Sequence, residues 1–167
     1  MLLYVAYAYN SGPQLLGVLS TAAGIVGIPI TFSSGYLMDR FGRKTTMVPG
    51  FALVGGGLTL MALSAYWHWS LSAFVIAFLW ISVAQSVTSG SMQVLGSDLA
   101  PPTARGRFFG IWRLVGEIGH IFSPAIFALL AEQVAYAASF SFLALCAFLA
   151  AVLIGLQLRD TIGRRRL

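Results

Sequence analysis

The chain has 167 residues, of which 58% are hydrophobic and only 9% are charged, whereas about 25% of the residues in a soluble domain are charged. The mean hydropathy of +0.85 is too high for a water-soluble globule of this size, which excludes a cytosolic enzyme, a secreted module and a disordered tail. The net charge of +5 comes from basic residues that lie between apolar runs, so membrane topology accounts for it better than a nucleic-acid partner does. The single cysteine excludes a disulfide framework and a CxxC metal site.

Five long apolar segments could each cross a membrane, because a spanning helix needs roughly 20 apolar residues. Helices are favoured over strands, since alternation with a period of two residues is absent. The expected spans lie near residues 14–37, 46–66, 71–95, 108–130 and 134–158. Residues 1–9 are apolar but lack the features of a signal peptide, so they are interpreted as the end of a preceding helix. The sequence therefore predicts an all-α integral membrane helical bundle that forms one domain over residues 1–167.

Nine of the ten Lys and Arg residues fall on one side of these spans. They are Arg40, Arg43 and Lys44 in the first loop, Arg105 and Arg107 in the third loop, and Arg159 and Arg164–Arg166 in the tail. The loops at residues 66–70 and 131–133 carry none. Because basic loops tend to remain in the cytoplasm, we expect the C-terminus inside and the N-terminus outside.

The first basic loop has a distinctive pattern, Gly35-Tyr36-Leu37-Met38-Asp39-Arg40-Phe41-Gly42-Arg43-Lys44. Gly35 would let two antiparallel helices approach closely, and Gly42 permits a tight turn with a positive φ angle. Asp39 can cap the next helix or pair with Arg40 or Arg43. The cations of the loop would hold it at the anionic inner leaflet.

This loop resembles the signature G-x-L-x-D-R-x-G-R-K of the major facilitator superfamily, and all seven specified positions match. Between the third and fourth spans, residues 98–107 resemble the D-L-A-P-x-x-x-R-G segment of the same family. The resemblance implies that Asp98 and Arg105 form a cytoplasmic charge cluster with Arg40 and Arg43 of the first loop. In this family such a cluster holds one access state and breaks in the other.

A complete member of this family has twelve helices in two halves of six. Here the signature loop is followed by four more spans and a short basic tail, and the third span has Gln85 in a segment where the N-terminal half usually has an arginine. The resemblance therefore implies the C-terminal half of the transporter fold, which requires an N-terminal six-helix half or a second copy of the chain. Within the family, the sequence resembles bacterial drug exporters. This resemblance implies an antiporter of the bacterial plasma membrane.

Three ionisable residues of the fourth span, Arg113, Glu117 and His120, share one helical face and are candidates for a solute or proton pathway. Glu117 lies about 12 residues beyond Arg105, or roughly 18 Å along the helix, close to the middle of the membrane. A carboxylate there either pairs with Arg113 or carries a proton. Arg113 could instead reach the interface, and His120 is either a proton relay or an ordinary hydrogen-bonded histidine.

Two further faces carry small or polar residues. Gln85 is a pathway candidate beside Ser82, Ser86, Ser89 and Gln93, and this face of the third span is either lined by water or hydrogen-bonded to another helix. In the fourth span, the face with Gly116 and Gly119 is predicted to pack closely against another helix.

The sequence contains no G-x-x-x-x-G-K-[ST] loop and no set of residues with metal-ligand spacing, so neither an ATP site nor a metal or other cofactor is expected. The energy for transport would come from a gradient, and we expect proton-coupled efflux of drug-like compounds. Uptake of a sugar or an organic acid by the same fold is the alternative. Two functions of other classes are alternatives to transport: an integral membrane enzyme that uses Glu117 and His120, and a non-transporting scaffold. The signature loop favours transport over both. Expected partners are a small solute, protons and membrane lipids.

Overall fold

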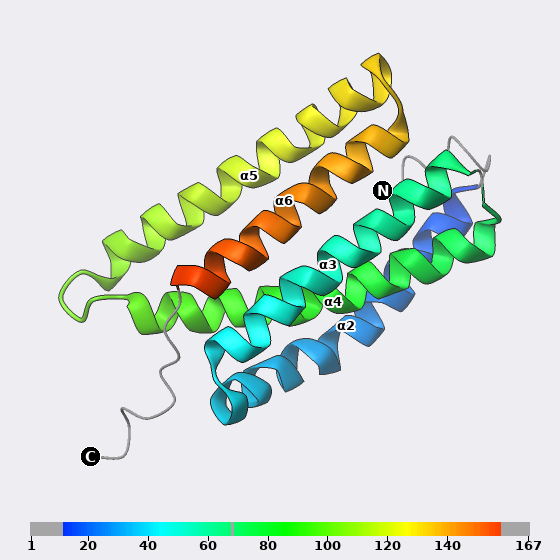
Figure 1. Cartoon of the computed structure of the whole chain (residues 1–167). Helices are drawn as coiled ribbons and strands as arrows, with labels where there is room; N and C mark the ends of the chain where they lie inside the picture. The colour runs from blue at the N-terminus through cyan, green and yellow to red at the C-terminus, as the bar shows by residue number, and fades with distance from the viewer. Residues whose placement is uncertain (1–11, 68, 158–167) are drawn as a thin grey trace.

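The computed structural model describes residues 12–67 and 69–157, and these residues form five long helices. The helices are α2 (Pro13–Phe41), α3 (Arg43–Tyr66), α4 (Leu71–Leu99), α5 (Arg105–Gln133) and α6 (Tyr136–Gln157) (Figure 1). Each is long and apolar enough to cross a membrane, and together they form the all-α bundle that the sequence predicts. The apolar segment 1–9 and the basic tail that begins at Arg159 lie outside the described residues.

The junction between α2 and α3 consists of Gly42 alone. Its φ angle is 97°, and its backbone N–H donates a hydrogen bond to the carbonyl of Met38 at 3.0 Å. Residues with a Cβ rarely adopt this φ angle, so the tight turn expected at Gly42 is confirmed. Of the two roles that the sequence leaves open for Asp39, capping of the next helix is not adopted, because Gly42 itself is the N-cap of α3 and no side-chain hydrogen bond caps it.

α3 forms the centre of the packed part of the bundle, between α4 and α6 (Figure 1). The larger core cluster is made by α2, α3, α4 and α6, with Met61, Phe74 and Phe140 completely buried. Glycine is required at one contact, because a Cβ on Gly57 would lie 2.8 Å from Cδ1 of Trp80. The Trp80 indole N–H also donates to the carbonyl of Leu53 at 3.1 Å, which ties α4 to α3.

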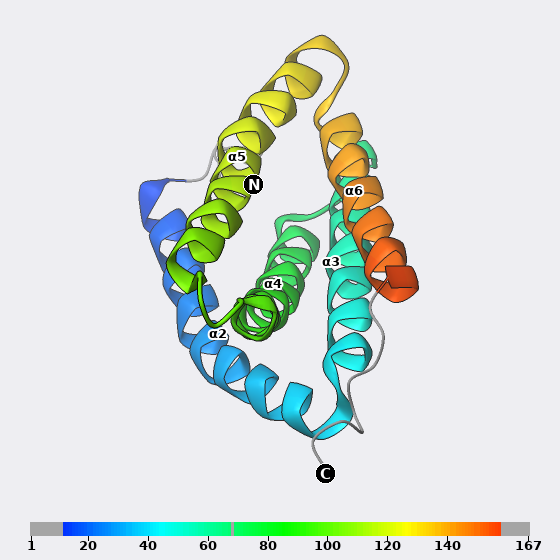
Figure 2. The same ribbon diagram turned by 90° about the vertical axis from the view of Figure 1, so that its left-hand side faces the viewer.

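α4 lies between α3 and α2, as the view along the bundle shows (Figure 2). α2 and α4 touch most closely at Gly27 and Gly90, where an added Cβ would press on Ser86 and Ser34, respectively. The close helix approach expected at Gly35 does not occur among the described helices, since a Cβ there would meet no described atom within 4 Å. The close contacts on α2 lie at Gly27, about two turns earlier, and at Ser34, the residue before Gly35.

α5 is the least packed helix, and none of its residues is buried. It joins α6 in a hairpin whose two arms diverge from their connection (Figure 2). Phe127 packs edge-on against Phe140 of α6, with ring centroids 5.1 Å apart, and the Ser139 hydroxyl donates to the Phe127 carbonyl at 2.9 Å. The sequence predicts that the face of this helix with Gly116 and Gly119 packs closely against another helix, but among the described residues no atom lies within 4 Å of a Cβ placed on either glycine.

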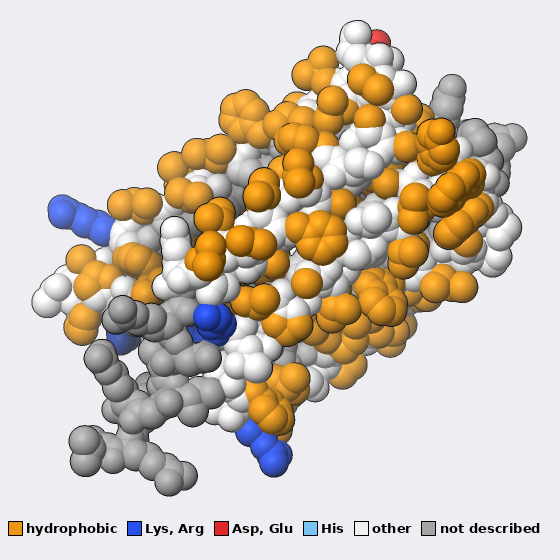
Figure 3. Space-filling model, in the orientation of Figure 1, with side chains coloured by type: hydrophobic (Ala, Val, Ile, Leu, Met, Phe, Trp, Pro, Cys, Tyr) orange, Lys and Arg blue, Asp and Glu red, His pale blue; other side chains and the backbone are white. Residues whose placement is uncertain are grey.

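Charge is unevenly distributed along the bundle. On the face shown in Figure 3, the Lys and Arg side chains lie toward the end at which α2 joins α3 and α4 joins α5. We call this the basic end; its described members, at the ends of α2, α3 and α5 nearest the two junctions, are Arg40, Arg43, Lys44, Arg105 and Arg107. Apolar side chains are spread over the whole length of the remaining visible surface, as expected for contact with lipid.

Candidate functional site: charged contacts and a groove between α2 and α4

At the basic end, Arg43 forms an ion pair with Asp98. Arg43 is the first residue of α3, and Asp98 lies in the last turn of α4, so the pair joins the two loops in which the sequence predicts a charge cluster. The two side chains are 24% and 27% exposed. The pair is therefore largely but not wholly shielded from water, and neither side chain is left as an unpaired buried charge.

The other predicted members of the cluster are not joined to this pair. Arg40 contacts its own helix: its guanidinium donates to the Tyr36 hydroxyl at 3.3 Å and lies 5.7 Å from the centre of the Phe41 ring. Asp39 and Arg105 are exposed and form no ion pair with the residues that the structure describes. Their gating role, like that of Lys44, stays a prediction.

On α5, Arg113 and Glu117 lie one turn apart, with Nε of Arg113 3.8 Å from Oε1 of Glu117. Their side chains are 85% and 58% exposed, and His120 is exposed as well. This loose contact is the pairing of Glu117 with Arg113 that the sequence offers beside a proton-carrying role. It gives each of the two charges on this membrane-spanning helix a partner.

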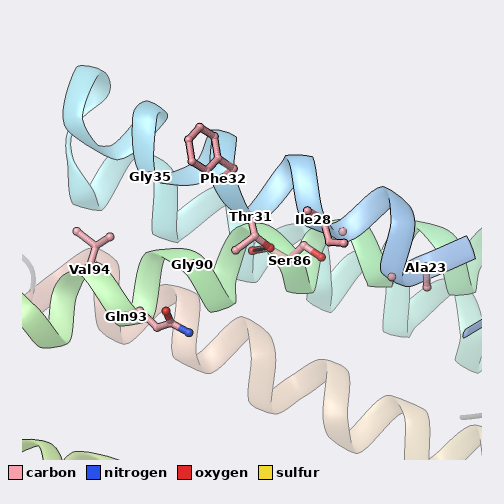
Figure 4. Close-up of a pocket in the computed structure, with 11 residues that line it drawn as sticks. Ala23, Ile28, Thr31, Phe32, Gly35, Ser86, Gly90, Gln93 and Val94 are labelled. Atoms are coloured by element: carbon pink, nitrogen blue, oxygen red, sulfur yellow. Dashed lines mark hydrogen bonds between the residues drawn. The ribbon is translucent and has the colours of Figure 1, made fainter. Parts of the chain in front are cut away.

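An open groove of about 680 Å³ runs between α2 and α4, within the range of pockets that hold drug-sized ligands. Figure 4 shows Thr31 of α2 and Ser86 of α4 facing each other in it. The Thr31 hydroxyl donates weakly to the Ser86 carbonyl, at 3.4 Å. Glycines allow the groove to exist: Gly24 and Gly35 line it, and neither has an atom within 4 Å of the position a Cβ would take.

A smaller hollow of about 340 Å³ adjoins this groove on the polar side of α4. Most hydroxyls of α4 are already used, since Ser82 and Ser86 donate to carbonyls one turn earlier at 2.8 and 2.9 Å. Gln85, Ser89 and Gln93 differ: all three are exposed, and none has a hydrogen bond with the described part of the chain. We call these three residues the polar flank of α4.

The groove wall on α2 was missed by sequence reasoning. Thr31, Ile28 and Phe32 line it, and the last two are 74% and 87% exposed. The spacing of Gly24, Gly27, Thr31 and Gly35 at helical intervals is the signal that could have identified this face. Among residues 12–67 and 69–157, no group of three His, Cys, Asp or Glu side chains could hold a metal ion.

Five long apolar helices with basic residues at one end define an integral membrane protein. The chain matches the sequence model of the Major Facilitator Superfamily over residues 1–166, and it belongs to that family. No solved structure gives a significant match.

Three relatives illustrate the range of the family. The chain is 27% identical to an uncharacterized MFS-type transporter of Salmonella typhimurium, over 86% of this chain and 36% of that protein. It is 26% identical to glycerophosphoinositol transporter 1 of Saccharomyces cerevisiae, over 83% and 26% of the two chains. It is 27% identical to a Na(+), Li(+), K(+)/H(+) antiporter of Planococcus maritimus, over 77% and 30%. The matched region thus covers about a third of the length of these relatives.

Proposed function

We propose that this chain forms one half of a secondary transporter that moves a small solute across a membrane by alternating access. The observation that carries this proposal is the groove between α2 and α4, bordered by a polar flank that is open in a membrane-spanning bundle. Exposed amides facing lipid would be costly, and a solute path supplies the water and the ligand that they need.

The transporting unit contains a second helical bundle, either an N-terminal six-helix half or a second copy of this chain. Support comes from α5, whose charged side chains and open glycines are left uncovered by the other described helices. The basic end faces the cytoplasm of a bacterial cell by the positive-inside rule, which puts the C-terminus there too. The Arg43–Asp98 pair then closes the cytoplasmic side in one access state.

Efflux of drug-like compounds in exchange for protons is the function that the groove supports best, because Ile28 and Phe32 offer an apolar wall. Glu117 is the proposed proton carrier, and the family resemblance to an H(+) antiporter agrees with such coupling. Sugar uptake is the second candidate, favoured by the amides of Gln85 and Gln93.

The test is flux through the whole transporter reconstituted in liposomes with a pH gradient. Proton movement is followed with an entrapped pH-sensitive dye while drug-like compounds, sugars and organic acids are added in turn. We expect one class to move protons with a fixed stoichiometry. Solute flux that does not depend on the pH gradient would contradict proton coupling. The absence of flux for every solute would contradict transport.

A further inference from the structure

We propose that the α2–α4 groove binds an uncharged, amphipathic organic molecule, with its hydrogen-bonding edge on α4 and its apolar face on α2. This inference rests on the proposed transport function and names the chemical class of the solute. It separates uncharged solutes from organic acids and organic cations, which the family resemblance leaves open.

The described walls of the groove and of the adjoining hollow carry no ionisable side chain, because none of their residues is Asp, Glu, Lys, Arg or His. A charged solute would lose its hydration on entering and would find no counter-charge in these walls to replace it. An uncharged solute avoids that penalty.

The polar flank has hydrogen-bonding groups that the described chain does not use. Gln85 and Gln93 each offer two N–H donors and a carbonyl acceptor, and Ser89 adds a hydroxyl. These three residues recur every four positions, so they form a row along α4. They have no hydrogen bond within the described residues, and a solute with hydroxyl or amide groups along one edge would satisfy them.

On α2 the opposite wall of the groove is mostly apolar, because Gly24, Ile28 and Phe32 present backbone and apolar surface. Thr31 adds one hydroxyl to this wall, and that hydroxyl is directed at the Ser86 carbonyl. Gly24 leaves space that any side chain would take. A ring or a branched apolar group fits this wall, while a solute that is polar on every side would leave Ile28 and Phe32 facing its hydroxyls.

The row of the polar flank ends at Gln93, and Gly96 lies about one turn further toward the basic end. A Cβ on Gly96 would lie 3.2 Å from Cε2 of Trp112, so the indole of α5 packs directly on α4 there. Trp112 therefore covers α4 just beyond the polar flank.

The test uses three acetanilides of similar size on the purified whole transporter, each carrying tritium, with binding measured by equilibrium dialysis. The uncharged probe is 4-acetamidophenol, the anion is 4-acetamidobenzoate, and the cation is 4-acetamidobenzylammonium. We expect the uncharged probe to bind at least about tenfold more tightly than either ion, which corresponds to about 1.4 kcal/mol.

Two variants place this binding in the groove. Gly24→Leu fills the groove without a clash, and Gln93→Leu removes an amide of the polar flank. Each should weaken binding of 4-acetamidophenol at least about fivefold. Gly17→Leu is the matched control, because Gly17 is an equally open glycine of α2 that does not line the groove; it should leave binding unchanged.

Tighter binding of either ion, equal binding of all three probes, or binding of none would overturn the inference. So would an equal effect of Gly17→Leu and Gly24→Leu. The proposed transport function is judged separately, by gradient-driven flux in liposomes. Flux of a charged solute would uphold transport and refute the solute class, whereas absence of flux for every solute would refute transport itself.

Discussion

α3 and α5 are both long helices apolar enough to cross a membrane, yet they are packed in opposite ways. Half of the most apolar stretch of α3 is buried inside the bundle, and none of that of α5 is. Hydropathy therefore determines that a segment enters the membrane, but the identity of its neighbours depends on where small residues permit contact. α3 has close contacts at Gly50, Gly55 and Gly57, whereas Gly116 and Gly119 of α5 have none within the described chain.

The largest expected effect separates these two sets of glycines. Gly57→Leu would force a side chain against Trp80 and Ile81, and we expect it to destabilise the 167-residue chain by about 3 kcal/mol. Gly116→Leu has free space and should change stability by less than about 1 kcal/mol. Unfolding in mixed detergent micelles measures both. Equal destabilisation would break the comparison, because α5 would then be packed in the same way as α3.

The second prediction asks whether the open side of α5 carries protons. In the whole transporter, Glu117→Gln should reduce proton-driven flux at least about tenfold while sparing exchange of solute between the two sides, because exchange needs no net proton movement. Glu132→Gln, at the far end of α5, is the control and should retain coupled flux. If Glu117→Gln leaves both activities intact, the residue is structural; if it abolishes expression, the contact with Arg113 holds the helix in place.

The third prediction concerns Asp98, whose partner Arg43 begins α3. Asp98→Asn should slow flux about threefold and change stability by less than about 1 kcal/mol, since the pair is partly exposed. Exchanging the two residues, Arg43→Asp with Asp98→Arg, should recover part of the flux. Failure of the exchange together with a large loss of stability would mean that the pair holds the fold rather than the access state. Asp39→Asn is the comparison variant, because Asp39 has no ion pair within the described chain. Its flux and its stability are measured beside those of Asp98→Asn.

The smallest expected effect is that of Cys146→Ser. Cys146 is an exposed residue of α6, so the substitution should change stability by less than about 0.5 kcal/mol.

In the Cys146→Ser background, Gly116→Cys reports on the side of α5 that faces the proposed solute path. A membrane-impermeant thiol reagent should modify the cysteine at position 116 and should fail to modify Cys146 in the unaltered chain. The reverse pattern would place α5 against lipid.

The sequence predicts the elements of this fold more completely than their contacts. The five apolar runs predict the five helices, and the spacing in the first loop predicts the positive φ angle of Gly42, because both properties depend on local residues. The partner of Arg43 is suggested only by the family resemblance. The absence of a cap at Asp39 and of a close neighbour at Gly35 could not be predicted, since each depends on the angle between two helices.

The same holds for the candidate site, where the sequence identifies single residues but not the contacts that they make. Gln85 is identified from the sequence because an amide within an apolar span is conspicuous. Ile28 and Phe32 are not, since they are indistinguishable from the lipid-facing residues around them until the groove beside α4 is seen. Whether the polar face of α4 is open or hydrogen-bonded to another helix also depends on packing, and the described helices leave it open.

The single-residue junction at Gly42 also has a geometric consequence for α2. With 29 residues, α2 is about 44 Å long, and the backbone dihedral angles of Gly42 set its direction relative to α3. Pro29 lies inside the helix, so the segment between Pro29 and Gly42 is the part whose direction this single residue sets. A rotation of about 10° at Gly42 would move the backbone by about 2 Å at Gly35, on the wall of the groove.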